Sequence, residues 1–173
     1  WKQSNTQSIQ DLKFSATASY FGKHLYGDNG HIPIGLISSA VGGASIETFL
    51  VNQVDNGNGA QFGNSALYKR LIYPYTNWEN SETGKGIQLA GVIWYQGEAD
   101  ANSSKITMPA YTKAMESMVS DYRTVFNDDS LPFMYVQLAA FDNPGGEYAA
   151  MREAQFNYMI GKNTTNGKPE NVG

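Results

Sequence analysis

Apolar side chains recur along this chain in two patterns, one typical of helices and one typical of buried strands. Phe14, Ala18, Phe21 and Leu25 share one helical face, and a comparable face runs through residues 111–125. The second pattern consists of short continuous apolar runs, which suit strands that are covered on both sides. Together they predict helices over residues 12–26, 46–51, 65–72, 111–125 and 147–160, and strands over residues 32–37, 89–95 and 133–138.

The alternation of strands and helices predicts an α/β fold with a mainly parallel sheet in a single domain. Residues 52–63 are rich in Asn and Gly and are expected to form a surface loop, while Pro109 is expected at or just before the first turn of a helix. Ligands of such folds bind at the carboxyl ends of the strands. This rule selects residues 38–45, 96–100 and 137–143 as candidate site segments.

Composition excludes several classes of protein. The 173 residues suffice for one domain, and 41% hydrophobic residues with 13% aromatic residues indicate a folded globular protein. A net charge of -4 and a pI of about 5.1 provide no basic surface for nucleic acid or for an anionic membrane. The lack of cysteine excludes disulfides and cysteine-bound metals. No apolar stretch approaches the roughly 20 residues of a membrane-spanning helix, and the start at Trp1 leads us to expect a processed or excised segment.

The pair Gly42-Gly43 follows the first predicted strand. Without Cβ atoms the backbone turns sharply there and leaves amide N–H groups free to point at a ligand. Donors of this kind stabilise the oxyanion that forms in acyl transfer. The same pair is typical of a tight turn between a strand and a helix, so both interpretations stay open.

A polar cluster consisting of Gln96, Gly97, Glu98 and Asp100 follows the strand predicted over residues 89–95. It supplies a neutral amide, a flexible glycine and two carboxylates. Paired carboxylates serve as acid and base, or as ligands for a hard cation. Because Asp and Glu also favour the starts of helices, a purely structural capping role is an equally open interpretation.

The chain has two histidines, His24 within the first predicted helix and His31 in the turn that follows it. Neither lies at the carboxyl end of a predicted strand, so we expect both to be structural or surface residues. A hydrolase with a serine nucleophile normally needs a histidine to accept the proton of the serine. This chain offers no good candidate for that base.

The segment Trp94-Tyr-Gln-Gly-Glu-Ala-Asp100 is the most distinctive block of the sequence. It is similar to the W-Y-Q-G-E-[SA]-[ND] block of the sialate O-acetylesterases, a branch of the SGNH/GDSL hydrolases that removes acetyl groups from sugars. Further segments resemble blocks of that family in the same order, namely residues 14–22, 32–47, 66–74, 131–138 and 151–155. The collinear matches make the resemblance far more specific than one short motif.

This resemblance implies a flavodoxin-like three-layer sandwich with a mainly parallel sheet, incomplete in this chain, and a partial esterase domain over residues 1–173. The family's nucleophilic serine lies upstream in a G-Q-S-N-M turn and its histidine lies downstream in a D-x-x-H block, and the chain lacks both. Ser4 imitates the serine block, but we expect it to be an ordinary terminal residue because no strand precedes it and Lys2 replaces the required glycine. We therefore expect the chain to be an internal fragment of a carbohydrate O-acetylesterase and to be inactive alone.

The resemblance also assigns roles to residues of this chain. It implies an oxyanion hole made of Gly42, Gly43 and Gln96, and a substrate-binding group made of Gly97, Glu98 and Asp100. The Gly43 N–H and the side-chain amide of Gln96 are the expected donors, and Gly97 leaves room for the acetyl group. Glu98 is expected to orient the site, and Asp100 either does the same or caps a helix. No metal and no cofactor are expected.

Expected partners follow from the same resemblance: an acetylated carbohydrate, no nucleic acid, no membrane, and a complementary chain or segment that completes the sheet. The missing strand would lie between the strands that end near Gly42 and Gln96, so we expect the isolated monomer to be unstable. A secreted or periplasmic location is expected.

Competing functions remain open at this point. A carbohydrate-binding or interaction module that keeps the esterase scaffold without the chemistry suits the lack of both catalytic groups. A metal-dependent hydrolase that uses Glu98 and Asp100 is a weaker alternative, because no histidine stands near them in the sequence. Acetylated xylan or another acetylated glycan competes with sialic acid as the substrate.

Overall fold

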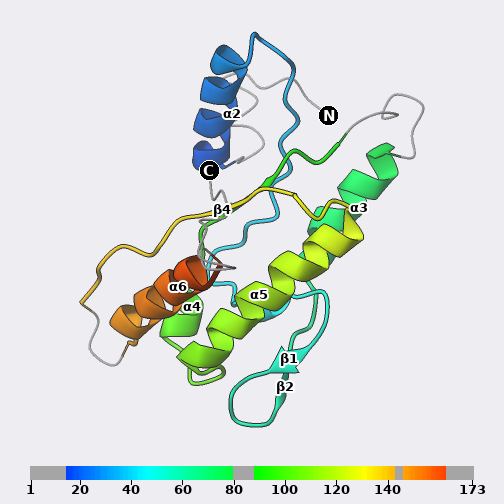
Figure 1. Ribbon diagram of the computed structural model, residues 1–173. Coiled ribbons are helices and arrows are strands. Elements are labelled where there is room, and N and C mark those ends of the chain that lie inside the picture. The colour runs from blue at the N-terminus through cyan, green and yellow to red at the C-terminus, as the bar shows by residue number, and fades with distance from the viewer. Residues whose placement is uncertain (1–14, 80–87, 143–145, 163–173) are drawn as a thin grey trace.

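The computed structural model describes residues 15–79, 88–142 and 146–162 of the chain (Figure 1). The helical elements are α2 (Ala16–Asp28), the short 3-10 helix η1 (Ile46–Thr48), α3 (Tyr68–Glu79), α4 (Glu98–Ala101), α5 (Met108–Val125) and α6 (Tyr148–Lys162). The strands are β1 (Val54–Asp55), β2 (Gln61–Phe62), β3 (Val92–Trp94) and β4 (Phe133–Tyr135). Figure 1 shows α5 crossing the middle of the molecule, with α3 on one side of it and α4 and α6 on the other. None of the helices in these ranges is long and apolar enough to cross a bilayer.

Strands β3 and β4 form a parallel pair, as the sequence predicted, in a register that places Trp94 opposite Tyr135. The two faces of this pair differ. Trp94 is buried and packs edge-on against Phe49, with ring centroids 4.8 Å apart. Ile93 and Met134 point to the other face, where they are exposed. One side of the pair therefore contributes to the core, and the other side remains open.

The prediction of a strand over residues 32–37 is wrong, because these residues form no strand. A strand needs a neighbour that satisfies its backbone donors and acceptors, and within the described ranges β3 pairs only with β4. Pro33 additionally lacks a backbone donor. The segment packs instead against α2, where Gly22 approaches Leu36 so closely that a Cβ would lie 2.8 Å from its Cδ1. Ile32 remains 62% exposed.

The helical face predicted over residues 111–125 is confirmed by α5. Tyr111, Met115, Met118 and Tyr122 are each at most 1% exposed, whereas Val125 at the end of the helix is 40% exposed. A proline occupies the first turn of α5, as expected. Burying each of the large apolar side chains contributes about 1.5–3 kcal/mol, and α5 makes its most extensive contact with α6. The core therefore lies around α5.

The ends of other predicted helices also shift in the structure. The helix expected over residues 65–72 begins only at Tyr68, because Ser65 has a left-handed backbone (φ 58°) and the N–H of Leu67 donates to the carbonyl of Thr48 at 2.8 Å. It then continues through Pro74 to Glu79. Helix α6 agrees with its prediction to within two residues at each end.

The expected surface loop over residues 52–63 contains the short antiparallel pair β1 and β2. The Asn56 side chain shapes the connection, since its Oδ1 accepts from the backbone N–H of Asn58 at 2.9 Å and of Ala60 at 3.2 Å. Gly57 and Gly59 both have positive φ values within the same turn. The Asn and Gly residues that suggested a loop therefore build a hairpin.

Candidate active site

The carboxyl end of β3 meets the loop that carries the glycine pair, and Asp100 lies where the two join. Asp100 is fully buried. Its Oδ1 accepts a hydrogen bond from Ser45 Oγ at 2.6 Å, and its Oδ2 accepts from the N–H of Ile46 at 2.9 Å and from Gln96 Nε2. All of these donors are neutral. The structure thus joins two candidate site segments that are more than 50 residues apart in the sequence.

The side chain of Gln96 is bonded at both ends of its amide. Its Nε2 donates to the carbonyl oxygen of Ala44 at 3.0 Å and to Asp100, and its Oε1 accepts from the Tyr111 hydroxyl at 3.0 Å. Burial raises the pKa of Tyr111 well above its usual range, so this phenol stays a donor at neutral pH. Because an amide nitrogen has two hydrogens, Gln96 donates to another group only by exchanging one of these bonds.

The glycine pair forms an exposed turn in which the N–H of Ala44 donates to the carbonyl of Val41 at 3.2 Å. Gly43 has φ +74°, a conformation that favours glycine. The pair therefore forms a tight turn before η1, but the expected strand does not precede it, because residues 32–37 form none. Within the described ranges the N–H groups of Gly42 and Gly43 have no hydrogen-bond acceptor. They are free to serve as donors, and their role in an oxyanion hole stays a prediction.

Gly97 is the N-cap of α4, and two features of its position favour glycine. Its backbone has φ +144°, and a Cβ would lie 3.0 Å from both Gln155 Nε2 and Leu138 Cδ1. Gln155 fills this space because its Nε2 donates to the Gln96 carbonyl and its Oε1 accepts from the Leu138 N–H, both at 2.9 Å. Gly97 is itself buried. Whether it also leaves room for an acetyl group stays a prediction.

Glu98 and Asp100 lie in the first turn of α4, as the capping interpretation expects, but they differ in exposure. The Glu98 side chain is exposed, whereas Asp100 is enclosed. Substrate binding by either stays a prediction. No group of three or more His, Cys, Asp or Glu side chains is placed to hold a metal ion in the part of the chain that the structure describes.

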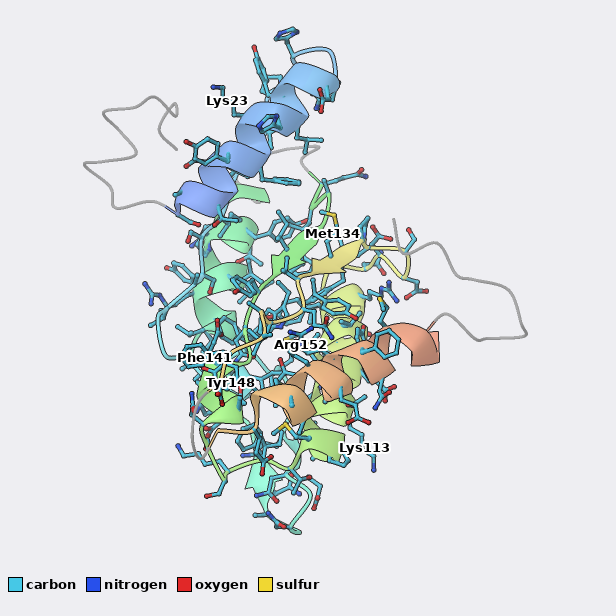
Figure 2. The ribbon with its side chains drawn as sticks, turned by 90° about the vertical axis from the view of Figure 1, so that its left-hand side faces the viewer. Lys23, Lys113, Met134, Phe141, Tyr148 and Arg152 are labelled. Carbon is cyan, nitrogen blue, oxygen red and sulfur yellow. The ribbon has the colours of Figure 1, made fainter. Side chains whose placement is uncertain are left out.

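The third candidate segment leaves β4 and runs beside α6. Gln137 Nε2 donates to the carbonyl of Arg152 at 2.8 Å. Figure 2 shows Phe141 next to Tyr148 at the start of α6, with ring centroids 5.1 Å apart. The Tyr148 hydroxyl accepts from Asn102 Nδ2 at 3.1 Å, directly after α4. Residue 143, the last of this predicted segment, lies outside the described residues, as does Ser4.

The histidines lie where the sequence placed them. His24 is exposed on α2, and His31 is exposed just after it, with its ring edge-on to Tyr26 at 4.9 Å. The sequence interpretation of both as surface residues is confirmed.

Sequence reasoning missed the roles of Ser45, Tyr111 and Gln155. A usable signal existed for Gln155, because it shares a helical face with Met151, Ala154 and Tyr158, all of them buried. A polar side chain on an apolar face needs buried partners. No comparable signal marks Tyr111, whose ring suits the core and whose hydroxyl alone reaches Gln96.

Fold and site together define an α/β chain whose candidate site residues gather at the carboxyl ends of parallel strands. A family described as carbohydrate esterase, sialic acid-specific acetylesterase, matches residues 4–167. The chain belongs to this family, which confirms the resemblance found in the sequence.

Relatives of known name agree with this assignment. Sialate O-acetylesterases of Pongo abelii and Homo sapiens are each 30% identical to the chain over 164 residues, covering 81% of it and 29% of the relative. A crystal structure of a novel carbohydrate acetylesterase from Xanthomonas citri matches with a TM-score of 0.64 and 30% identity, covering 85% of this chain and 32% of that one. The chain thus spans under a third of the length of these relatives.

Proposed function

We propose that this chain is part of a carbohydrate O-acetylesterase that removes acetyl groups from sialic acid or a related acetylated glycan. The observation that carries the proposal is the junction of the glycine turn with the end of β3 through Gln96 and Asp100. The family match over residues 4–167 supports the reaction class. The names of the relatives support an acetylated sugar as the substrate.

In the proposed mechanism a serine from outside this chain attacks the acetyl carbonyl, and a histidine from outside it acts first as base and then as acid. The Gly43 N–H, which is unpaired among the described residues, stabilises the oxyanion. Gln96 supplies a second donor by exchanging its bond to Ala44 or Asp100 for one to the oxyanion. Water then releases acetate from the acyl-serine in a second step of the same kind.

We also propose that the described elements belong to a three-layer sandwich whose sheet is completed by a further strand beside β3. Two observations support a partner there. β3 pairs on one side only within the described ranges, and Ile93 and Tyr95 remain exposed. Unpaired backbone groups at a sheet edge are satisfied when another strand adds to it. The partner is a complementary segment or chain of extended, apolar character.

Acetate release tests the proposal. The protein encoded by the complete reading frame that contains this sequence should release acetate from an O-acetylated sialic acid or another acetylated sugar, and the 173-residue chain alone should not. Gln96→Leu should lower kcat by about 100-fold, since loss of one oxyanion donor costs about 3 kcal/mol of barrier. Gln53→Leu, a change at an exposed glutamine whose Nε2 donates to the Gly63 carbonyl at 3.1 Å, lies outside the candidate site segments and is the matched control. Sugar binding without acetate release by the complete protein would favour a non-catalytic binding module.

A further inference from the structure

Asp100 connects the two groups that the proposed function treats as donors. Ile46 and Ser45, whose N–H and hydroxyl it accepts, follow closely after Gly43 in the chain. Gln96, which donates to the same carboxylate, ends the segment after β3. A single buried side chain therefore fixes the distance between the glycine turn and the Gln96 amide.

The chemistry of a carboxylate also determines how its neighbours are oriented. A carboxylate offers acceptors only, so Gln96 must turn its nitrogen toward Asp100. The Tyr111 hydroxyl on the other side donates to the Gln96 oxygen. The contacts with Asp100 and Tyr111 therefore both require the same orientation of the Gln96 amide. A second nitrogen contact, to the Ala44 carbonyl, ties the same amide to the residue after the glycine pair. Substituting Asp100 therefore loosens the turn at Ser45 and Ile46 and leaves the amide with its bonds to Ala44 and Tyr111 alone.

Burying a carboxylate among neutral donors is costly compared with burying an apolar side chain of similar volume. Asp100 has no exposed surface in this structure, so it does not contact a substrate directly. These two facts favour a geometric role. On the basis of the function proposed above, we propose that Asp100 is a positioning residue that sets the Gly43 N–H and the Gln96 amide relative to each other and acts on acetyl transfer through them.

Kinetics of the complete protein test this role. Asp100→Ala should lower kcat for acetate release at least tenfold while KM changes less than twofold, because the donors are displaced and the sugar contacts remain. Asp100→Asn keeps one acceptor oxygen and should recover most of the loss, to within about threefold of the unmodified protein. Ser45→Ala removes a single bond to Asp100 and should lower kcat about threefold. Ser19→Ala, whose hydroxyl in α2 donates to the Ser15 carbonyl at 2.9 Å and not to Asp100, should leave kcat unchanged.

Hydrogen exchange provides a readout that needs no activity. The Ile46 N–H donates directly to Asp100, so its exchange should accelerate at least tenfold in Asp100→Ala, and by less in Ser45→Ala, while the N–H of Met118 in the core of α5 is unaffected. Unchanged Ile46 exchange in folded Asp100→Ala would overturn the positioning role.

The outcomes separate this inference from the proposed function. If the unmodified protein releases no acetate from any acetylated sugar, the proposed function fails, and the exchange of Ile46 alone decides whether Asp100 holds the loop. If the protein is active, a rise in KM with constant kcat in Asp100→Ala would overturn the inference, since it would indicate a substrate contact. A tenfold loss in Asp100→Asn equal to that in Asp100→Ala would also overturn it.

Discussion

Gln155 donates from its side-chain nitrogen to the carbonyl oxygen of Gln96 at 2.9 Å, and this bond joins helix α6 to the end of β3. The Gln155 oxygen accepts from the Leu138 N–H beyond β4, also at 2.9 Å. One side chain thus continues the pairing of the two strands past the point where their own ladder ends. Gln155 is 1% exposed, so neither bond is replaced by water when it is lost.

Gln155→Leu should therefore destabilise the protein strongly. The substitution leaves the Leu138 N–H buried without a partner and leaves the Gln96 carbonyl with only the long contact from the Tyr111 hydroxyl at 3.5 Å, and a buried group that loses its partner costs about 1–3 kcal/mol. We expect a loss of at least about 2 kcal/mol, measured by urea unfolding of the complete protein. Gln137→Leu is the control, because this exposed glutamine makes one bond, to Arg152, and its loss should cost less than about 0.5 kcal/mol. Equal effects of both changes would contradict the bridging role.

Gly97→Ala should be harmful although only one methyl group is added. A backbone with φ +144° is strained for any residue with a Cβ, and the new atom would also press on Gln155 and Leu138 at 3.0 Å. We expect a loss of about 2 kcal/mol or more in urea unfolding. Gly27→Ala in α2 meets no atom within 4 Å and should instead be neutral or stabilising by up to about 1 kcal/mol. A neutral Gly97→Ala would show that the turn adapts.

Much of this arrangement was predictable from local patterns. The period of α5 placed Tyr111, Met115, Met118 and Tyr122 on one buried face because side chains three or four apart share a helical face. The strands β3 and β4 were recognisable as apolar runs, and the rule for the ends of parallel strands selected the polar cluster that follows β3. These predictions succeeded because each depends on neighbours within about ten residues.

The remaining features depend on contacts between distant segments. Residues 32–37 have the apolar composition of a strand, but a strand forms only where a partner strand is available, and composition does not report that. The hydroxyl of Tyr111 and the amide of Gln155 both reach Gln96 from other helices, the latter 59 residues away in the sequence. Only the folded chain reveals that the side chains of Tyr111 and Gln155 both contact Gln96.

Two buried tyrosines of α5 provide a matched pair of substitutions. The Tyr111 hydroxyl donates to Gln96 Oε1 and the Tyr122 hydroxyl donates to the carbonyl of Phe49, both at 3.0 Å. Tyr111→Phe and Tyr122→Phe should each cost about 1–2 kcal/mol of stability, since each leaves one buried oxygen unpaired. Only Tyr111→Phe should also lower kcat for acetate release, by about threefold to tenfold, because Gln96 then loses one of its constraints. Similar kcat values for both variants would contradict a link between Tyr111 and the site.

Stability should fall in alkaline solution because buried tyrosines resist ionisation. Burial raises the pKa of Tyr158 to about 12, while an unfolded tyrosine ionises near pH 10. Between these values the unfolded state has released a proton that the folded state retains, so stability is complete below pH 10 and declines as pH rises toward 12. The decline reaches about 1.4 kcal/mol per pH unit for each such group. Burial also raises the pKa values of Tyr111 and Tyr122. These two tyrosines therefore make the loss of stability with rising pH steeper.

Tyr158→Phe isolates one of these contributions. Among the described residues the Tyr158 hydroxyl makes no hydrogen bond, and the side chain is 7% exposed, so the change should alter stability little at pH 8. Urea midpoints measured from pH 8 to pH 11.5 should then decline less steeply in the variant than in the unmodified protein. Parallel curves would show that Tyr158 does not contribute to the alkaline loss.

The open side of the β3 and β4 pair predicts how the 173-residue chain behaves alone. Ile93, Tyr95, Met134 and Val136 are between 37% and 57% exposed on this pair and its extensions, and β3 has one pairing partner within the described ranges. Edges and faces of this kind associate with other chains. We expect the purified chain to self-associate, or to lack a cooperative thermal transition as a monomer, in light scattering and calorimetry.

A charged substitution on the open face should show whether the isolated chain self-associates through that face or simply folds poorly. Ile93→Lys adds a charge to the exposed side of β3 and should reduce self-association, because a lysine on an exposed strand opposes pairing with another chain. Val125→Lys, at a position 40% exposed at the end of α5, adds the same charge away from the sheet and should leave association unchanged. If the unmodified chain is monomeric and unfolds cooperatively, the sheet needs no complementary segment. In that case the exposed apolar side chains of β3 and β4 are tolerated as ordinary surface.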